Sequence, residues 1–213
     1  MNASRRAVIG NFLLFQTLWF AAVMGGARGL HWPALLALAA LLLWNLGHGA
    51  AGWREARMLL GGLAVALVLE PLWLASGVIQ YVGQWHPLLP PLWILALWCG
   101  FALTFNHSLA WLQGRLRLAA LLGAVGSAGS VIAGVRFAAA DAPQGLIVLA
   151  VTYGALWALA VPLLTMWAAC GRTSERGKPA PRQRAVRQGV EAYKELRQPQ
   201  RETGLSREQV NER

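Results

Sequence analysis

The feature that most constrains this chain is a series of six apolar blocks, separated by short stretches rich in Gly, Pro and Arg. An α-helix rises about 1.5 Å per residue, so roughly 20 apolar residues are needed to cross the hydrocarbon core of a bilayer. The blocks hold between 17 and 26 residues each. They cover Ala7–Gly25, Trp32–His48, Met58–Ile79, Pro91–Leu112, Leu118–Phe137 and Gly145–Cys170. We therefore predict six transmembrane helices, of which the second is the shortest.

Composition agrees with a chain that lies mostly in a membrane. Hydrophobic residues make up 56% of it and charged residues 13%, whereas charged residues make up about 25% of a soluble domain. In lipid every backbone polar group must be satisfied within the protein, which leaves helices or closed barrels. Barrel strands are about half as long as these blocks, and their polarity alternates. The predicted fold class is an all-α polytopic membrane bundle over residues 1–170, followed by a polar tail over 171–213.

The first block has two interpretations. Arg5 and Arg6 precede it and Ala21–Ala22 lies near its end, as in a secretory signal peptide. However, its apolar run exceeds the usual length of about 7–15 residues and contains bulky aromatic residues such as Trp19. We favour an uncleaved first span and keep a cleaved signal peptide as the alternative.

Lys and Arg are distributed unevenly between the two sides of the predicted bundle. One side has Arg28 and Arg136. The other side has Arg5, Arg6, Arg54, Arg57, Arg115, Arg117 and the basic tail. Because cytoplasmic loops carry the excess of positive charge, both termini are expected in the cytoplasm.

Polar side chains recur at similar depths in different blocks. Asn11 lies about one turn from the cytoplasmic end of the first block, and Asn106 and His107 lie one to two turns from that end of the fourth. Gln16 and Glu70 lie near the midplane. These residues are the candidate binding or catalytic residues of the chain, together with one Arg considered next.

Glu70 is the most costly residue to place in lipid, because a carboxylate at a helix centre costs about 2.5–3.5 kcal/mol to insert. It shares one helical stripe with Gly62, Ala66 and Gly77, a small-residue face that lets a neighbouring helix approach closely. Arg136, toward the periplasmic end of the fifth block, is long enough to pair with Glu70. The alternative is that Arg136 extends to the outer head groups.

The fifth block carries a similar stripe. Gly126, Ser130 and Gly134 recur every four residues, with Gly123 and Ser127 beside them. This spacing predicts a tight seam between packed helices.

The string "LTFNHSLAWL" (103–112) places three hydrogen-bonding side chains in a row within an apolar block. On a continuous helix, Asn106 and His107 lie on adjacent faces. Asn106 is expected to join helices by hydrogen bonds, with Asn11 as its partner, and Ser108 to bond back to the carbonyl of Thr104. His107 has two open interpretations, a structural hydrogen bond or an acid–base group oriented by Glu70 or Asn106.

Several signatures of enzyme chemistry are missing from the sequence. The His residues are scattered, with no pair one turn apart as zinc or di-iron sites require. His48 and His107 approach the same side, but two single His residues do not indicate a haem. Cys99 and Cys170 lie at different depths and are not expected to pair. There is no Gly-rich phosphate loop, Gly-x-Ser-x-Gly elbow or Cys-x-x-Cys motif. We predict no metal and no cofactor.

The combination of an F-Q-x-x-W-F first span with the N-H-S-L-A-W-L string at 106–112 resembles a family of bacterial inner-membrane proteins known only as a domain of unknown function. The resemblance covers about residues 7–170. It implies that Glu70 stands where the family carries an Asp, and that a Gly-Pro-Leu-Ser-Tyr run in span five is altered here to Gly126–Val131. Gene order in the family implies a link to lipid-modifying enzymes and thus to envelope lipids.

Two functions follow from these observations. One is a membrane module that binds lipids or a partner such as a lipid-modifying enzyme. The other is an intramembrane enzyme or carrier for a lipid-like substrate, with His107 as acid or base and Glu70 or Asn106 orienting it. The tail holds eleven basic and six acidic residues, and we expect it to be disordered or to form a short amphipathic helix over 182–198. The mixture of charges, with no recognisable module, argues against nucleic-acid binding.

Overall fold

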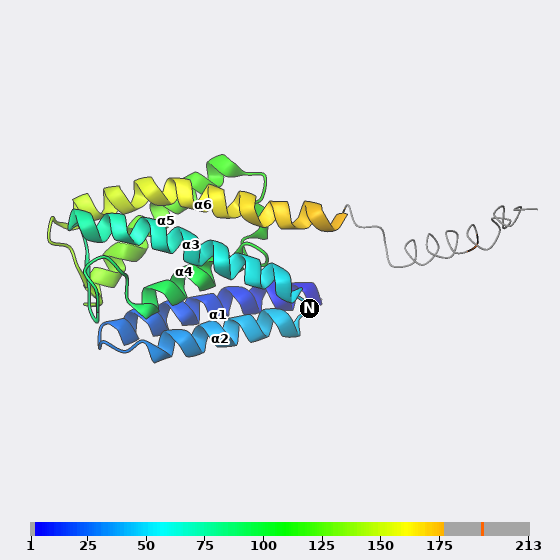
Figure 1. The fold of residues 1–213 in the computed structure, drawn as a ribbon, viewed down its shortest axis with the longest axis horizontal. Coiled ribbons are helices and arrows are strands. Elements are labelled where there is room, and N and C mark those ends of the chain that lie inside the picture. The colour runs from blue at the N-terminus through cyan, green and yellow to red at the C-terminus, as the bar shows by residue number, and fades with distance from the viewer. Residues whose placement is uncertain (1–2, 177–192, 194–213) are drawn as a thin grey trace, which may run out of the picture. The chain divides into compact units, whose positions relative to one another are not determined.

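The computed structural model describes residues 3–176 and residue 193, and the predicted tail helix therefore lies outside the described residues except at one position. The described chain forms six helices and one two-stranded ladder (Figure 1). The helices are α1 (Ala3–Gly26), α2 (Trp32–Gly47), α3 (Gly52–Ser76), α4 (Leu92–Thr104), α5 (Leu116–Arg136) and α6 (Leu146–Arg176). The strands are β1 (Gln80–Tyr81) and β2 (Ala140–Asp141), and a short 3₁₀ turn, η1, covers Ala110–Leu112.

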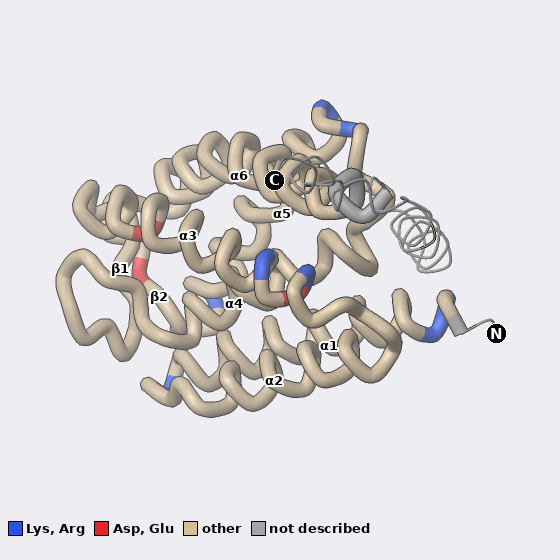
Figure 2. The backbone as a smooth tube through the Cα atoms, turned by 45° about the vertical axis from the view of Figure 1, so that its right-hand side comes forward, with Lys and Arg blue, Asp and Glu red and all other residues tan. Residues whose placement is uncertain are grey.

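Four of the helices are long and apolar enough to cross a membrane, namely α1, α3, α5 and α6. The other two are apolar but shorter: α2 has 16 residues and α4 has 13. At about 1.5 Å per residue, α4 is only about 20 Å long, less than the thickness of a hydrocarbon core. The expected all-α fold with six helices is thus confirmed, and four of the six have the length of a membrane span. In Figure 2 most of the tube over the helices is tan, because few charged residues lie within them.

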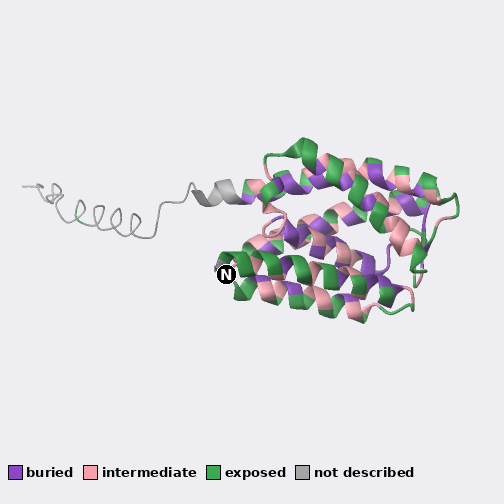
Figure 3. Ribbon diagram, turned by 180° about the vertical axis from the view of Figure 1, so that it is seen from behind, coloured by how far each residue is buried: buried purple, intermediate pink, exposed green. Residues whose placement is uncertain are grey.

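The shortest helix lies at the centre of the packing. α4 contacts α1, α2 and α3, and α1 also packs along α2. More than half of the residues of α4 are buried, among them Trp93, Trp98 and Ala102. The exposed residues lie on the outward faces of the surrounding helices (Figure 3). On α3, Gly62 allows this approach, since a Cβ there would lie 2.7 Å from the Cβ of Ala102. The small-residue face predicted on α3 is confirmed at this helix pair.

The predicted fourth span is wrong in its second half. α4 ends at Thr104, and residues 105–109 form turns before η1 instead of continuing a helix to Leu112. The carbonyl of Thr104 accepts the backbone N–H groups of His107 (2.9 Å) and Leu109 (2.8 Å). The carbonyl of Phe105 accepts a bond from the side chain of Gln113 at 2.8 Å. The unwound backbone thus finds hydrogen-bond partners within the protein.

The two ends of the bundle differ in how they are closed. At the end where α1 and α3 finish, β1 pairs antiparallel with β2, Gln80 opposite Asp141 and Tyr81 opposite Ala140. α3 reaches this ladder through Gly77, which has a left-handed φ of 68° at the helix C-cap. We call this the ladder end. At the opposite end, where α1 and α3 begin, the turns after α4 meet three helices, and we call this the ring end.

Candidate functional site

A chain of hydrogen bonds at the ring end joins α1, α2, α3 and the turns after α4. Asn11 donates through Nδ2 to Oδ1 of Asn45 at 3.0 Å, and Asn45 donates through Nδ2 to Oε2 of Glu55 at 2.8 Å. Oε1 of Glu55 in turn lies 3.1 Å from Nδ2 of Asn106 and 3.1 Å from Nε2 of His107. Ser108 closes the chain, since its Oγ donates to Oδ1 of Asn11 at 2.6 Å. These six residues are called the polar ring below.

The direction of the hydrogen bonds in the polar ring is fixed by two backbone groups. The N–H of Ser108 donates to Oδ1 of Asn11 at 3.2 Å, so Asn11 must present its Nδ2 to Asn45. Asn45 must then present its own Nδ2 to Glu55. On the other side, Asn106 donates through Nδ2 to the carbonyl of Arg54 at 3.4 Å as well as to Glu55. Glu55 therefore receives donors from both sides and acts as an acceptor only.

The polar ring differs from the expected partnerships. Asn106 does not bond to Asn11, because it turns toward Glu55. Ser108 does not bond back to Thr104, because that segment is not helical and its hydroxyl reaches α1 instead. His107 is paired with Glu55 and not with Glu70. What the sequence did predict is that Asn11, Asn106 and His107 share one layer of the bundle, and this is confirmed.

Two members of the polar ring, Asn45 and Glu55, are not among the site residues predicted from the sequence. Both are about 1% exposed, and Asn11 is fully buried. Glu55 lies between Arg54 and Arg57, so it is easily assigned to a charged loop, although it is one of only three acidic residues in the first 170. That scarcity was the available signal, because a rare carboxylate at the start of an apolar helix needs internal donors.

A second cluster surrounds Glu70 near the ladder end. Glu70 is 2% exposed and accepts hydrogen bonds from Nε1 of Trp98 at 2.7 Å and from the hydroxyl of Tyr81 at 2.7 Å. The Tyr81 hydroxyl also bonds to the hydroxyl of Tyr153, whose ring stacks on Trp73. Burial, and secondarily the charge of Glu70, raises the pKa of Tyr81 well above its usual range. Tyr81 therefore remains a proton-bearing donor to Glu70.

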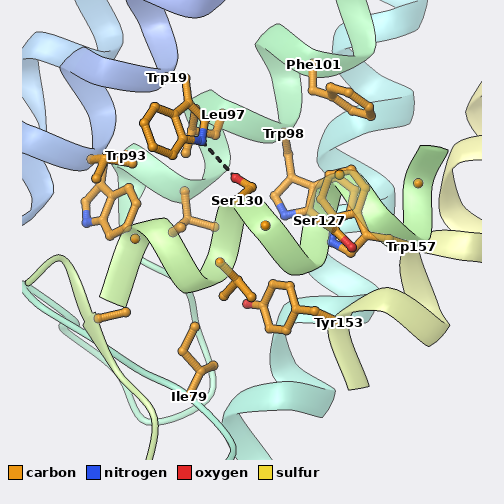
Figure 4. A pocket seen from close by; sticks show the side chains of 18 of the residues that line it. Trp19, Ile79, Trp93, Leu97, Trp98, Phe101, Ser127, Ser130, Tyr153 and Trp157 are labelled. Atoms are coloured by element: carbon orange, nitrogen blue, oxygen red, sulfur yellow. Dashed lines mark hydrogen bonds between the residues drawn. The ribbon is translucent and has the colours of Figure 1, made fainter. Parts of the chain in front are cut away.

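The Glu70 cluster forms part of the wall of a large cavity. Its volume is about 620 Å³, within the range of about 300–1,000 Å³ typical of ligand sites. α1, α4, α5 and α6 supply most of its lining, and β1 and β2 contribute one residue each. Figure 4 shows aromatic side chains around it, including Trp93, Trp98, Tyr153 and Trp157. The indoles of Trp98 and Trp157 stack with ring centroids 4.2 Å apart.

The cavity opens sideways between two long helices. All of its exposed lining residues belong to α1 or α5. The large hydrophobic ones are Phe20, 54% exposed, on α1 and Leu122 and Val125, 42% and 65% exposed, on α5. Nε1 of Trp19 on α1 donates a hydrogen bond to Oγ of Ser130 on α5 at 2.8 Å (Figure 4). The opening therefore lies on the lateral surface of the bundle and not at either end.

The small-residue stripe on α5 is not the tight seam that its spacing predicted. Gly126, Ser130 and Gly134 line the cavity, and a Cβ added at either glycine would meet nothing within 4 Å. Gly123 alone makes the expected close contact, with the carbonyl of Trp157 at 2.5 Å from its ideal Cβ. Small residues permit close helix contact, but among the described residues no helix fills the space beside Gly126 and Gly134. The same stripe instead makes room in the cavity.

The two remaining predicted residues lie apart from the polar clusters. Gln16 lines the cavity from α1 and is exposed at its opening. Arg136 ends α5 and is exposed, and within the described residues no ion pair joins it to Glu70. The described residues also contain no group of three or more His, Cys, Asp or Glu side chains arranged to hold a metal ion.

Comparison with known proteins identifies a family. A family model described as protein of unknown function, DUF2878, matches residues 8–163. The searches of curated proteins and of solved structures gave no match. The matched region includes the polar ring, the Glu70 cluster and all of the cavity-lining residues, and it covers well over half of the 213 residues. The chain belongs to the DUF2878 family of unknown function, as its resemblance to an uncharacterised membrane family predicted.

Proposed function

We propose that the protein is an integral membrane module that binds a lipid-like amphiphile in the cavity between α1, α4, α5 and α6. The observation that carries the proposal is the lateral opening between α1 and α5. Both helices have the length and hydropathy of membrane spans. An opening between two spans faces the bilayer, so molecules of the bilayer are the natural occupants.

We also propose that all six helices lie in the membrane. α2 and α4 are short, but α4 is enclosed by other helices and its unwound continuation is satisfied by side chains. Irregular backbone is tolerated at membrane depth where protein surrounds it. With both termini in the cytoplasm, the ring end is cytoplasmic and the ladder end periplasmic. The Glu70 cluster, about six residues before the end of α3, then lies in the outer half of an inner-membrane protein.

A lipid-modifying enzyme is the partner we propose for this module, on the basis of the gene order implied by the family resemblance. In this role the protein presents or withholds a bound amphiphile and performs no chemistry itself. The polar ring then has a structural task, since it fixes α1, α2 and α3 relative to one another at the ring end.

The test uses vesicles of phosphatidylethanolamine and phosphatidylglycerol in which part of the phosphatidylethanolamine, whose head group carries an ammonium, has a photoactivatable diazirine in its acyl chain. After irradiation, labelled peptides are identified by mass spectrometry. We expect labelling concentrated on residues 15–23 of α1 and 122–134 of α5, and we expect it to fall in Gly126→Leu and Gly129→Leu, which fill open space. Gly47→Leu is the matched control, because Gly47 is exposed, helical and outside the cavity. Equal labelling of every exposed apolar helix face, unchanged by the cavity variants, would contradict the proposal.

A second candidate function is an intramembrane enzyme or carrier that uses His107 as acid or base. One observation favours it: His107 is oriented by the buried carboxylate of Glu55 and its side chain is still 17% exposed. A lipidomic comparison of cells with and without the protein separates the two functions. An accumulated, chemically unmodified precursor indicates the enzyme. Loss of a partner's activity, with the partner present at its normal level, indicates the module.

A further inference from the structure

The ionisable side chains that line the cavity are acidic and not basic. Within the described part of the chain, its lining includes one carboxylate, that of Glu70, and no Lys, Arg or His side chain. The neighbours of Glu70 are hydrogen-bond donors without charge, the Trp98 indole and the Tyr81 hydroxyl. A buried carboxylate without a positive partner is costly in a medium of low dielectric constant. A cation that entered the cavity would provide the missing charge.

The rest of the lining is also suited to a cation. Aromatic faces attract ammonium groups within about 6 Å of the ring centre, and cages of several aromatic rings are the usual binding sites for quaternary ammonium ligands. Rings of Trp93, Trp98, Tyr153 and Trp157 line this cavity. No described residue offers a hydrogen bond to Nε1 of Trp157, whose ring stacks on that of Trp98. A phosphate or carboxylate head group would meet neither an Arg nor a Lys here, and it would face Glu70.

We propose that the cavity selects amphiphiles whose head group is a cationic ammonium, placed among these aromatic rings and against Glu70, with the apolar tail leaving between α1 and α5. This inference rests on the proposed function, because it names the class of ligand for the same cavity. It predicts discrimination by head group at constant tail length. Because cation–π attraction is strongest where the cation is desolvated, we expect at least a tenfold preference for the cation over a neutral head group.

The experiment compares three tritium-labelled amphiphiles with the same tail: hexadecyltrimethylammonium, hexadecanol and hexadecyl phosphate. Each compound is added in trace amount to the full-length protein, which is immobilised in neutral maltoside micelles. Specific retention is the amount bound above that of the double variant Gly126→Leu/Gly129→Leu, a reference that corrects for uptake by the micelle. We expect specific retention of the ammonium compound at least about tenfold above the alcohol, and none of the phosphate. Glu70→Gln should reduce this preference to threefold or less, because it removes the charge and keeps the shape of the side chain.

The outcomes distinguish a failure of the head-group inference from a failure of the proposed function. Equal specific retention of all three compounds would overturn the head-group inference and leave the proposed function standing. Retention of the phosphate above the ammonium compound would do the same. If none of the three is retained above the double variant, both proposals fail. The unsubstituted protein gives the decisive comparison, so the inference remains testable even where Glu70→Gln does not fold.

Discussion

Replacing Glu55 by Gln is the sharpest test of the polar ring, because the change is nearly isosteric and still disrupts it. The direction of the ring is fixed by the backbone N–H of Ser108 and the backbone carbonyl of Arg54. Glu55 must accept from both sides, whereas a Gln side chain has one acceptor oxygen and one donor nitrogen. If the Gln oxygen faces Asn106 and His107, its NH₂ group faces the Nδ2 donor of Asn45, and two donors meet in a buried site.

The loss of unfolding free energy expected for Glu55→Gln follows from the hydrogen bonds that change. A hydrogen bond to a charged group contributes about 1.5–3 kcal/mol to stability, and a bond between neutral groups about 0.5–1.5 kcal/mol. Glu55→Gln makes the acceptor neutral, so the two bonds from Asn106 and His107 together lose roughly 2 kcal/mol. The unsatisfied Asn45 donor adds about 1–3 kcal/mol. Hydrogen bonds measured within membrane bundles average only about 0.6 kcal/mol, so we take the lower part of this sum. The expected loss is about 3 kcal/mol, or roughly a hundredfold in the folding equilibrium.

Glu70→Gln is the matched control. Its Oε1 can still accept from Trp98, and its nitrogen can donate to Tyr81, because a phenol hydroxyl both donates and accepts and can rotate. We expect a loss below about 1 kcal/mol. Both variants are unfolded reversibly in mixed micelles with increasing dodecyl sulfate, followed by tryptophan fluorescence. Equal losses for the two variants, or a smaller loss for Glu55→Gln, would refute the assignment of direction in the polar ring.

Three further predictions follow from the same contacts. Gly62→Leu should destabilise the bundle by about 1–3 kcal/mol in the mixed-micelle unfolding assay, because Gly62 already touches α4 and a larger side chain overpacks the contact. Gly126→Leu should leave the unfolding midpoint in that assay nearly unchanged, because Gly126 borders open space. Ser108→Ala should cost at most about 1 kcal/mol in that assay, since the backbone N–H still bonds Asn11, and a loss as large as that of Asn11→Leu would contradict this account. Reporter fusions test the orientation of the chain. Fusions at Gly83 and Asp141 should report the periplasm, and fusions at Gly52, Gly114 and the tail should report the cytoplasm; the reversed pattern would overturn the predicted orientation.

The sequence by itself determined which segments are helical and which side chains are costly to bury. Block length and hydropathy identify helices because the bilayer imposes one requirement on every segment, so no knowledge of the neighbours is needed. The close face on α3 around Gly62 follows from spacing within one helix. The shared layer of Asn11, Asn106 and His107 follows from predicted depth alone, since consecutive predicted spans run in opposite directions.

Only the tertiary structure decided where α4 ends, which carboxylate pairs with His107, and whether a small-residue stripe is a seam or a cavity wall. α4 ends at Thr104 because Asn11 and Glu55, from helices far away in the sequence, offer hydrogen bonds to residues 106–108 that a continuing helix would not make. The stripes on α3 and α5 have the same spacing, yet α4 packs closely on the first at Gly62, whereas no described atom lies within 4 Å of a Cβ added at Gly126 or Gly134 on the second. Periodicity reports the character of a helix face, but what lies opposite that face depends on the packing of all six helices.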